Sequence, residues 1–353
     1  MRAKEIVFSG AKRTGILRST SSSEWRRRRL LILCYHGVSM RDEHEWNAEL
    51  YIPPNLLRQR LEYLRASGYN ILRLAEGCER LQNGTLPPRS VALTFDDGAA
   101  DFAAVALPIL RELDAPATVY LTTYYSDIGL PVFDVVLSYV LWRGRERRVD
   151  LAPLCDRSEP LWAQTPPERQ HAHATLVEYA RARELDVGAK DALVARVAGV
   201  VGVNYGEVLA SGVLRIMTPD TVAALPRELV DVQLHTHRHR TPLNRDLFLR
   251  ELRDNASSIR ALRGHEARLT HFCYPSGVCN TSFLPWLREA GVRYATTCAP
   301  GLASPNDHPL LLPRWVDTTH RSSLAFEAWV SGFADLLPKR PARRLDEQRR
   351  PSV

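Results

Sequence analysis

The sequence predicts an α/β fold built on a mostly parallel sheet, and two patterns carry this prediction. Short, largely apolar runs at 30–35, 91–95 and 117–121 are typical of strands that are buried on both faces. Helical patterns alternate with the predicted strands, as they do in βα units. The chain has 353 residues, of which 45% are hydrophobic and 25% are charged, so it can bury a large core and is not a disordered chain.

The expected elements follow in order along the chain. A helix begins after Pro54 with Leu57, Leu61 and Leu64 at helical spacing, and Gly68 ends it. Strands are expected at 71–74, 91–95 and 117–121, with a helix at about 101–113 between the last two. The alternation resumes with strands at 230–234, 270–274 and 294–297 and with helices at about 245–263, 281–290 and 323–333.

The segments at 29–126 and 214–336 carry this alternation, and three other segments do not. Residues 1–28 lack periodicity, and we expect them to form a flexible, basic arm. Residues 127–213 have the pattern of helices joined by loops, which predicts a helical insertion on the sheet scaffold and not a separate catalytic domain. Residues 337–353 are expected to form a basic tail.

The distribution of charge argues against a nucleic-acid partner. The chain has 47 Lys and Arg residues against 40 Asp and Glu, a net charge of +7, and much of the excess lies at 26–29 and 339–350. Basic runs near termini are usually solvated tails, and no run is interleaved with aromatic residues. The alternative is peripheral contact of the basic termini with anionic lipid head groups or an anionic glycan carrier.

The cysteines and the N-terminal segment favour a cytoplasmic, or membrane-peripheral, location. Six cysteines are scattered without CxxC spacing, which argues against a cysteine-based zinc site and a dense disulfide framework. The first 24 residues are polar and basic, and the apolar stretch at 30–34 is too short for a signal peptide. We therefore expect reduced thiols.

Two adjacent carboxylates, Asp96 and Asp97, directly follow the strand at 91–95. Ligand sites of parallel α/β folds lie at the carboxyl ends of strands, and Gly98 permits a turn that points both carboxylates into one cavity. Two such carboxylates repel unless a cation lies between them, and a metal on one leaves the other free as a base. The alternative is a plain loop in which Asp96 caps the next helix.

Three histidines directly follow the strand at 230–234. His235 and His239 are four residues apart, so both imidazoles can lie on one side, whereas His237 should point elsewhere. Two neutral histidines and one carboxylate are a common ligand set for a divalent metal, with open positions for water and substrate. The pattern therefore predicts a metal site, the alternative being structural or exposed histidines.

Two further strand ends carry weaker signals. The segment 272–277 ends a strand in a Pro/Gly turn, whose backbone N–H groups would suit an oxyanion hole, or which is simply a turn. His36 follows the strand at 30–35 and lies on the same rim, the alternative being a histidine that caps a loop.

Together these motifs resemble those of the NodB-homology polysaccharide deacetylases, carbohydrate esterase family four. The matching segments are TFDDG at 94–98, H-T-x-x-H at 235–239 and F-x-Y-P-x-G at 272–277, in this order. The segments YHGV at 35–38, SGYN at 67–70 and LPPRSVALTFDDG at 86–98 are similar to a branch with an N-terminal Tyr-His in place of a C-terminal Leu-x-His motif. That branch includes the poly-N-acetylglucosamine deacetylases. The resemblance covers about residues 30–125 and 214–335 and implies a distorted (β/α)7 barrel.

The resemblance also implies a role for each matching residue. Asp96 corresponds to the catalytic base, His36 to the general acid, and the backbone N–H of Ser276 to the oxyanion donor. Asp97, His235 and His239 correspond to the ligands of a divalent metal, which we expect to be Zn²⁺, with Co²⁺ or Ni²⁺ as alternatives. The candidates for substrate contact are Tyr35, Tyr274, Pro275, Arg314 and Trp315. The three aromatic residues among them are equally good candidates for the core.

Three positions depart from the pattern of the family. Cys273 stands where the family has an arginine that orients the base, and Arg314 is the candidate to do this work from another strand. Ser276 stands at the position of the motif tyrosine. The 138 positions from Asp97 to His235 are more than the family usually has, because of the helical insertion, which could reshape or cover the cleft or bind a partner.

The resemblance implies a metal-dependent hydrolase that removes an N-acetyl group from an amino sugar of a polysaccharide or glycan precursor. One alternative is a deacylase or deformylase of a lipid-linked or nucleotide-linked sugar. Another is an inactive, glycan-binding barrel in a polysaccharide-assembly complex, which the departures at Cys273 and Ser276 keep open.

Overall fold

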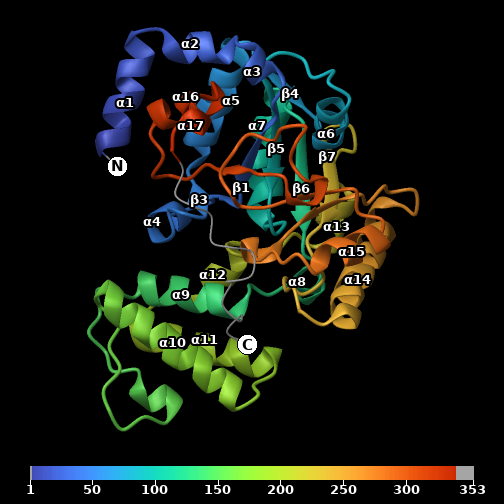
Figure 1. Ribbon diagram of the computed structural model, residues 1–353. Helices are drawn as coiled ribbons and strands as arrows, with labels where there is room; N and C mark the ends of the chain where they lie inside the picture. Colours follow the sequence, from blue (N-terminus) through green and yellow to red (C-terminus); the bar gives the residue numbers. More distant parts are fainter. Residues whose placement is uncertain (1, 339–353) are drawn as a thin grey trace.

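A curled parallel sheet surrounded by helices forms the body of the protein in the computed structural model, which describes residues 2–338 (Figure 1). Neighbouring strands follow the order β10-β1-β5-β6-β7-β8-β9. Their bounds are β1 (Leu31–Tyr35), β5 (Ser90–Phe95), β6 (Ala117–Leu121), β7 (Val230–Leu234), β8 (His271–Cys273), β9 (Tyr294–Thr296) and β10 (Trp315–Val316). All of these pairs are parallel.

One short segment joins the two edges of this sheet. Leu312 bridges to Thr296 of β9, and Trp315 pairs with Leu33 of β1. The remaining strands are peripheral: β4 (Asn70–Leu72) pairs with the first half of β5, and β2 (Gly37–Val38) pairs with β3 (Tyr51–Ile52) in a separate ribbon. The expected α/β class and distorted (β/α)7 barrel are therefore confirmed.

The alternation of side chains along each strand decides what faces the site. Leu31, Leu33 and Tyr35 of β1 belong to the main core between sheet and helices, whereas Ile32 belongs to a smaller core inside the barrel. Side chains two apart share a face. Cys34 therefore points into the barrel, as do Thr94 of the neighbouring strand β5 and Asp96, which directly follows that strand.

The helices around the sheet include those that we expected, to within a few residues, and four short ones that we did not expect. In chain order the helices are α4 (Glu43–Trp46), α5 (Pro54–Ala66), α6 (Leu74–Gln82), α7 (Leu107–Glu112), α8 (Tyr124–Ile128), α13 (Pro219–Ala223), α14 (Arg245–Arg263), α15 (Phe283–Glu289), α16 (Ser323–Val330) and α17 (Phe333–Leu336). The four that we did not expect are α4, α6, α8 and α13. A π-helical turn at Phe102–Ala106 leads into α7. No helix within residues 2–338 combines the length and the apolar character needed to cross a bilayer.

The N-terminal segment differs from the flexible arm that we expected at 1–28. It forms α1 (Arg2–Arg13), α2 (Ile16–Ser21) and α3 (Glu24–Arg27). Phe8 is buried and its ring lies 6.4 Å from that of Phe333, while Lys12 pairs with Glu327. The surface that covers these helices comes from α16 and α17, about 300 residues away in the sequence, so no local pattern revealed it. The basic tail expected at 337–353 lies outside the described residues from 339 onward.

The segment 127–213 forms helices with a core of their own. They are α9 (Phe133–Arg143), α10 (Pro166–Ala182), α11 (Val187–Val201) and α12 (Tyr205–Ala210). In Figure 1 they form a group at the opposite end of the molecule from α1. Helix α9 is tied to α4, because Trp46 Nε1 donates to Ser138 Oγ at 3.3 Å and Tyr139 Oη donates to Asp42 at 2.6 Å.

The docking of α1 can be tested by a pair of substitutions. Phe8→Ala removes a buried ring and should lower the free energy of unfolding by about 3 kcal/mol. Ile6→Ala, on the same helix but 71% exposed, should change it by no more than about 0.5 kcal/mol. Urea unfolding measures both values, and equal effects of the two substitutions would contradict the packing described for α1.

Candidate active site

Asp96 and Asp97 point in different directions because the backbone turns between them. Asp96 continues the inward face of β5 and is buried. Asp97 has φ 67° and Gly98 has φ 79°, both in the left-handed region. Aspartate tolerates this region better than most residues, and a side chain at Gly98 would also meet Leu121, whose Cδ1 is 2.3 Å from the position of a Cβ. The turn therefore carries Asp97 out to the mouth of the barrel.

Asp97 meets two histidines at that mouth. Its Oδ1 lies 3.1 Å from His235 Nε2 and 3.1 Å from His239 Nε2. His235 directly follows β7, and left-handed backbone at Thr236 (φ 62°) and His239 (φ 54°) folds the loop so that both rings face the carboxylate. The three expected metal ligands are thus brought together, with all ligand atoms within 4.8 Å of one another.

The proton positions in this cluster fit a bound cation. His235 Nδ1 is 2.9 Å from the carbonyl oxygen of Cys273, to which only a protonated Nδ1 can donate. In the neutral ring Nε2 then carries a lone pair that faces the Asp97 carboxylate. Such an arrangement requires either a second proton or a cation between the two atoms. The donor set of two imidazoles and one carboxylate suits a divalent metal with open positions.

Charge coupling shifts the pKa values of this cluster as well. Burial would raise the pKa of Asp97, but the neighbouring His239 and His235 hold it well below its usual value. Burial would lower the pKa of His239, yet the Asp97 carboxylate raises it. His237 does not take part, because its Nδ1 lies 2.8 Å from Thr123 Oγ1 and its ring packs against Tyr124.

Asp96 is held by Arg314 in a two-pronged ion pair inside the barrel. Nη1 donates to Oδ1 and Nη2 donates to Oδ2, each at 2.7 Å. Arg314 is fully buried, and its Nε also donates to the carbonyl oxygen of Thr297 at 3.0 Å. Burial would raise the pKa of Asp96, but the guanidinium holds it far below its usual value. Arg314 thus occupies the orienting position that Cys273 leaves open.

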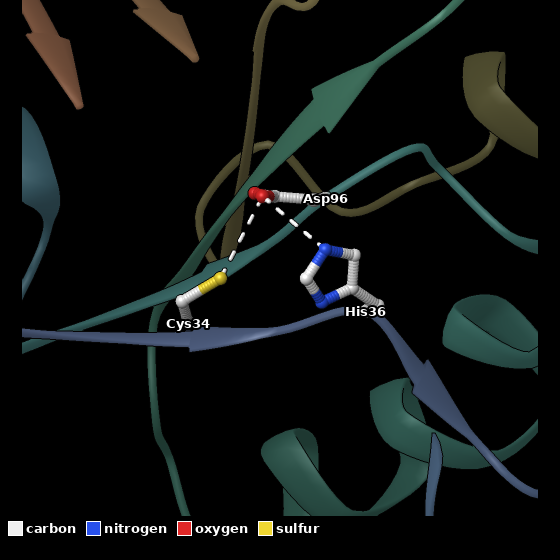
Figure 2. A group of neighbouring side chains, drawn as sticks. All are labelled: Cys34, His36 and Asp96. Atoms are coloured by element: carbon white, nitrogen blue, oxygen red, sulfur yellow. Dashed lines mark hydrogen bonds and ion pairs between the residues drawn. The ribbon is translucent and has the colours of Figure 1, made fainter. Parts of the chain in front are cut away.

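His36 and Cys34 also lie beside Asp96, as Figure 2 shows. His36 Nε2 lies 3.9 Å and Cys34 Sγ 3.6 Å from Asp96 Oδ2. His36 Nδ1 is buried and has no hydrogen-bond partner among the described residues. These three side chains are also close enough to hold an ion, but the Arg314 guanidinium already neutralises Asp96 and repels a second cation. The set at Asp97 is therefore the better metal site.

The turn after β8 places Ser276 at the same end of the sheet. This turn spans Pro275–Gly277, and Ser276 is exposed with φ 54° and ψ 18°. Its backbone N–H as an oxyanion donor stays a prediction.

The residues expected to contact substrate are buried. Tyr35 stacks on Phe95 at 5.3 Å, and Trp315 packs against Trp329 at 5.5 Å. The buried members of the predicted set are Tyr35, Tyr274, Pro275, Arg314 and Trp315. Their burial fits the alternative that they are core residues, and their contact with substrate stays a prediction. Tyr35, for instance, lies on the face of its strand that packs against helices, and Arg314 is fully occupied by Asp96.

The sequence prediction missed three supporting residues. Asn255 accepts the backbone N–H of His235 at 3.0 Å, and Glu251 accepts that of Arg238 at 2.8 Å. Both are buried polar residues, one turn apart on the otherwise apolar face of α14. Polar residues at apolar positions of a helix could have been recognised in the sequence as supports for a neighbouring loop. Asp101 accepts the N–H of Val38 at 3.1 Å and so anchors the loop that follows His36.

Comparisons with known proteins agree with this geometry. Residues 83–134 match the polysaccharide deacetylase family model. A stretch of 94 residues is 31% identical to the poly-beta-1,6-N-acetyl-D-glucosamine N-deacetylase of Escherichia coli (strain K12). That stretch is 26% of this chain and 14% of the relative, so the chain matches a small part of the relative's length.

Solved deacetylase structures share the fold over most of this chain. The Streptococcus pyogenes deacetylase PplD in complex with acetate has a TM-score of 0.56 at 20% identity, covering 88% of this chain and 99% of that one. IcaB from Ammonifex degensii has a TM-score of 0.53 at 16% identity, covering 86% and 97%. The resemblance seen in the motifs is confirmed to this extent: part of the chain matches the polysaccharide deacetylase family, and its barrel is similar to those of solved deacetylases.

Proposed function

We propose that this protein is a metal-dependent hydrolase that removes an N-acetyl group from an amino sugar of a glycan. The observation that carries the proposal is the cluster of Asp97, His235 and His239 at the barrel mouth, beside the ionised and oriented Asp96. Metal-assisted amide hydrolysis requires a metal site, a general base and a general acid. The ligand set, the separate carboxylate of Asp96 and the neighbouring His36 can supply these three. The matching family and the named activity of the Escherichia coli relative support the substrate class.

Asp97, His235 and His239 would hold the divalent metal, which we expect to be Zn²⁺. Such a metal would polarise the acyl oxygen and would lower the pKa of a bound water toward about 7. The chain's own residues do the rest. Asp96 removes a proton from the attacking water, and Arg314 keeps Asp96 ionised for this purpose. The backbone N–H of Ser276 donates to the oxyanion that develops on the acyl oxygen.

His36 gives a proton to the leaving amine. An amide nitrogen leaves poorly unless it is protonated, so the reaction needs an acid as well as a base. The Nε2 atom of His36 lies 3.9 Å from Asp96, and the side chain is partly exposed, which suits contact with both the site and the substrate. All five side chains required by the mechanism are thus present, and this favours an active enzyme over a glycan-binding barrel.

The alternative substrates are lipid-linked or nucleotide-linked sugars, with deacylation or deformylation as the reaction. We propose a cytoplasmic location, and the six free cysteines support a compartment that keeps thiols reduced. The acetate released from free, lipid-linked and polymeric N-acetyl sugars distinguishes these substrate classes.

The roles of the base and the acid predict a specific pattern of defects. Asp96→Asn and His36→Ala should each lower kcat by about 100-fold or more, because each removes a proton-transfer group. Both variants should still bind Zn²⁺ in a 1:1 ratio, since neither residue is a proposed ligand. Acetate release and metal analysis of the purified variants measure the two effects separately.

His239→Ala is the matched control for that experiment. It should lose both activity and metal, because it removes one of the proposed ligands. If His36→Ala lost metal and His239→Ala kept it, the two assignments would be the wrong way round. Full activity of Asp96→Asn would overturn the assignment of the base.

The role of Arg314 predicts a change in pH dependence. Arg314→Gln removes the charge that holds the pKa of Asp96 low, so burial, which opposes that charge, should raise this pKa above its ordinary value. A base works only when it is deprotonated, so activity should be lost first on the acid side. The acid limb of the kcat/KM profile should therefore move to higher pH. An unchanged acid limb in a folded variant would contradict the proposed role of Arg314.

A further inference from the structure

Three thiols surround the Asp96–Arg314 pair, and the proposed reaction uses none of them. Cys273 Sγ lies 3.3 Å from Asp96 Oδ2, and Cys34 Sγ lies 3.6 Å from the same oxygen. Cys298, which follows β9, has its Sγ 3.7 Å from Arg314 Nη2. The sulfur atoms come from three strand ends that are far apart in the sequence, so only the closed barrel brings them together.

Cys298 differs from the other five cysteines in its exposure and its neighbours. The other five are buried, whereas Cys298 is partly exposed. The hydrogen bond from the Cys34 thiol and the nearby Arg314 guanidinium lower the pKa of Cys298 to about 6, against the opposing effect of burial. Reactive cysteines occur in partly exposed, electropositive surroundings of this kind, whereas buried thiols are shielded from an oxidant in solution.

We propose that Cys298 is a site of covalent modification by small peroxides, with Cys34 as its resolving partner. The Cys298 thiolate attacks a peroxide oxygen; an S–O bond forms, the O–O bond breaks, and hydroxide leaves. The Cys34 sulfur then attacks the sulfenic sulfur; an S–S bond forms, and the S–O bond breaks with release of water. For hydrogen peroxide, two thiols are oxidised and one peroxide is reduced to two waters.

The modification acts on the base because both sulfur atoms touch its ion pair. Cys298 lies against the Nη2 atom of Arg314, and Cys34 lies against Oδ2 of Asp96. An S–S bond is shorter than the hydrogen-bond contact it replaces, so it draws the two strand ends together beside the guanidinium. The two-pronged contact between Arg314 and Asp96 then loses its geometry, and the hydrolase stops until a reductant restores the thiols.

Mass spectrometry of the full chain treated with hydrogen peroxide tests the chemistry without relying on any activity. The expected product is a peptide pair linked through Cys34 and Cys298 that dithiothreitol releases. Cys298→Ser should react at least about 10-fold more slowly, because the remaining thiols are buried. Cys34→Ser should accumulate a sulfenic acid at Cys298 that dimedone traps. Cys155→Ser, in the insertion, is the matched control and should behave like the unaltered chain.

Each other outcome overturns the proposal. A link between other cysteines, or equal oxidation of Cys298→Ser and the unaltered chain, would exclude Cys298 as the reactive thiol. A Cys34–Cys298 link that leaves acetate release unchanged would exclude the effect on Asp96. If no acetate is released even by the reduced chain, the proposed function fails, while the mapped link still decides the reactive cysteine.

The N-terminal segment carries a large surplus of positive charge. Residues 1–29 hold nine Lys and Arg residues against Glu5 and Glu24, a surplus of seven that equals the net charge of the whole chain. The rest of the protein is therefore neutral overall. Among the basic side chains, Lys4, Arg13 and Arg18 are exposed on α1 and α2.

Exposed apolar side chains accompany this charge. Ile6 is 71% exposed, and Val7 and Ile16 are each 45% exposed. Ile6 and Arg13 are seven residues apart on α1 and share the side opposite to the buried Phe8. A helix surface that combines exposed aliphatic side chains with basic ones fits the interface of an anionic bilayer, because the apolar groups enter the head-group region and the charges meet the lipids.

We infer that α1 and α2 bind the surface of an anionic lipid bilayer. Sedimentation with vesicles of phosphatidylglycerol and phosphatidylcholine tests this inference. The unaltered chain should bind these vesicles at low salt and release from them at high salt, and it should not bind pure phosphatidylcholine. The triple variant Lys4→Glu, Arg13→Glu, Arg18→Glu should lower the bound fraction by at least about 10-fold, since each basic residue contributes to attraction.

The triple variant Arg111→Glu, Arg196→Glu, Arg253→Glu is the matched control. It makes the same change in net charge at exposed arginines elsewhere in the chain. Equal loss of binding in both triple variants would show attraction by net charge alone and overturn the assignment to α1 and α2. Equal binding to neutral and anionic vesicles would overturn the role of lipid charge.

Discussion

The ion pair between Asp96 and Arg314 is the constraint on which the rest of the active site depends. Both groups lie inside the barrel, where an unpaired charge costs several kcal/mol. Arg314 satisfies Asp96 at both oxygens and is itself fixed by the carbonyl oxygen of Thr297. The carboxylate is therefore ionised and immobile before any substrate arrives, which is the condition under which a base in a water-poor cavity acts efficiently.

The same turn gives two neighbouring carboxylates different properties. Asp96 remains inside with a guanidinium, whereas the left-handed backbone of Asp97 carries its side chain to two imidazoles at the mouth. In the proposed mechanism, Asp96 transfers the proton and Asp97 binds the metal. This separation of roles by environment is how adjacent acids avoid sharing one proton.

Much of this arrangement could be predicted from the sequence, and the failures have physical causes. Parallel strands end at one edge of a sheet, so polar residues that follow apolar runs were predicted to converge, and Asp97, His235 and His239 do so. It was harder to predict on which side of the sheet each strand residue places its side chain. Tyr35 lies next to His36, but the two-residue period of a strand turns its ring into the core.

Long-range packing was the second cause of failure. The N-terminal helices are held by α16 and α17, and such contacts leave no periodic trace in either segment. The position of Arg314 was inferred only because Cys273 left a role unfilled. Asn255 and Glu251 show that a buried polar residue on an apolar helix face is a signal for the loop it supports.

The segment at 312–316 both joins the edges of the sheet and carries Arg314 between its two points of attachment. A chain synthesised only as far as β9 lacks both Arg314, the partner of Asp96, and the segment that joins the edges of the sheet. The closure of the sheet and the pairing of the proposed base therefore depend on the same short segment, which is among the last parts of the barrel to be synthesised.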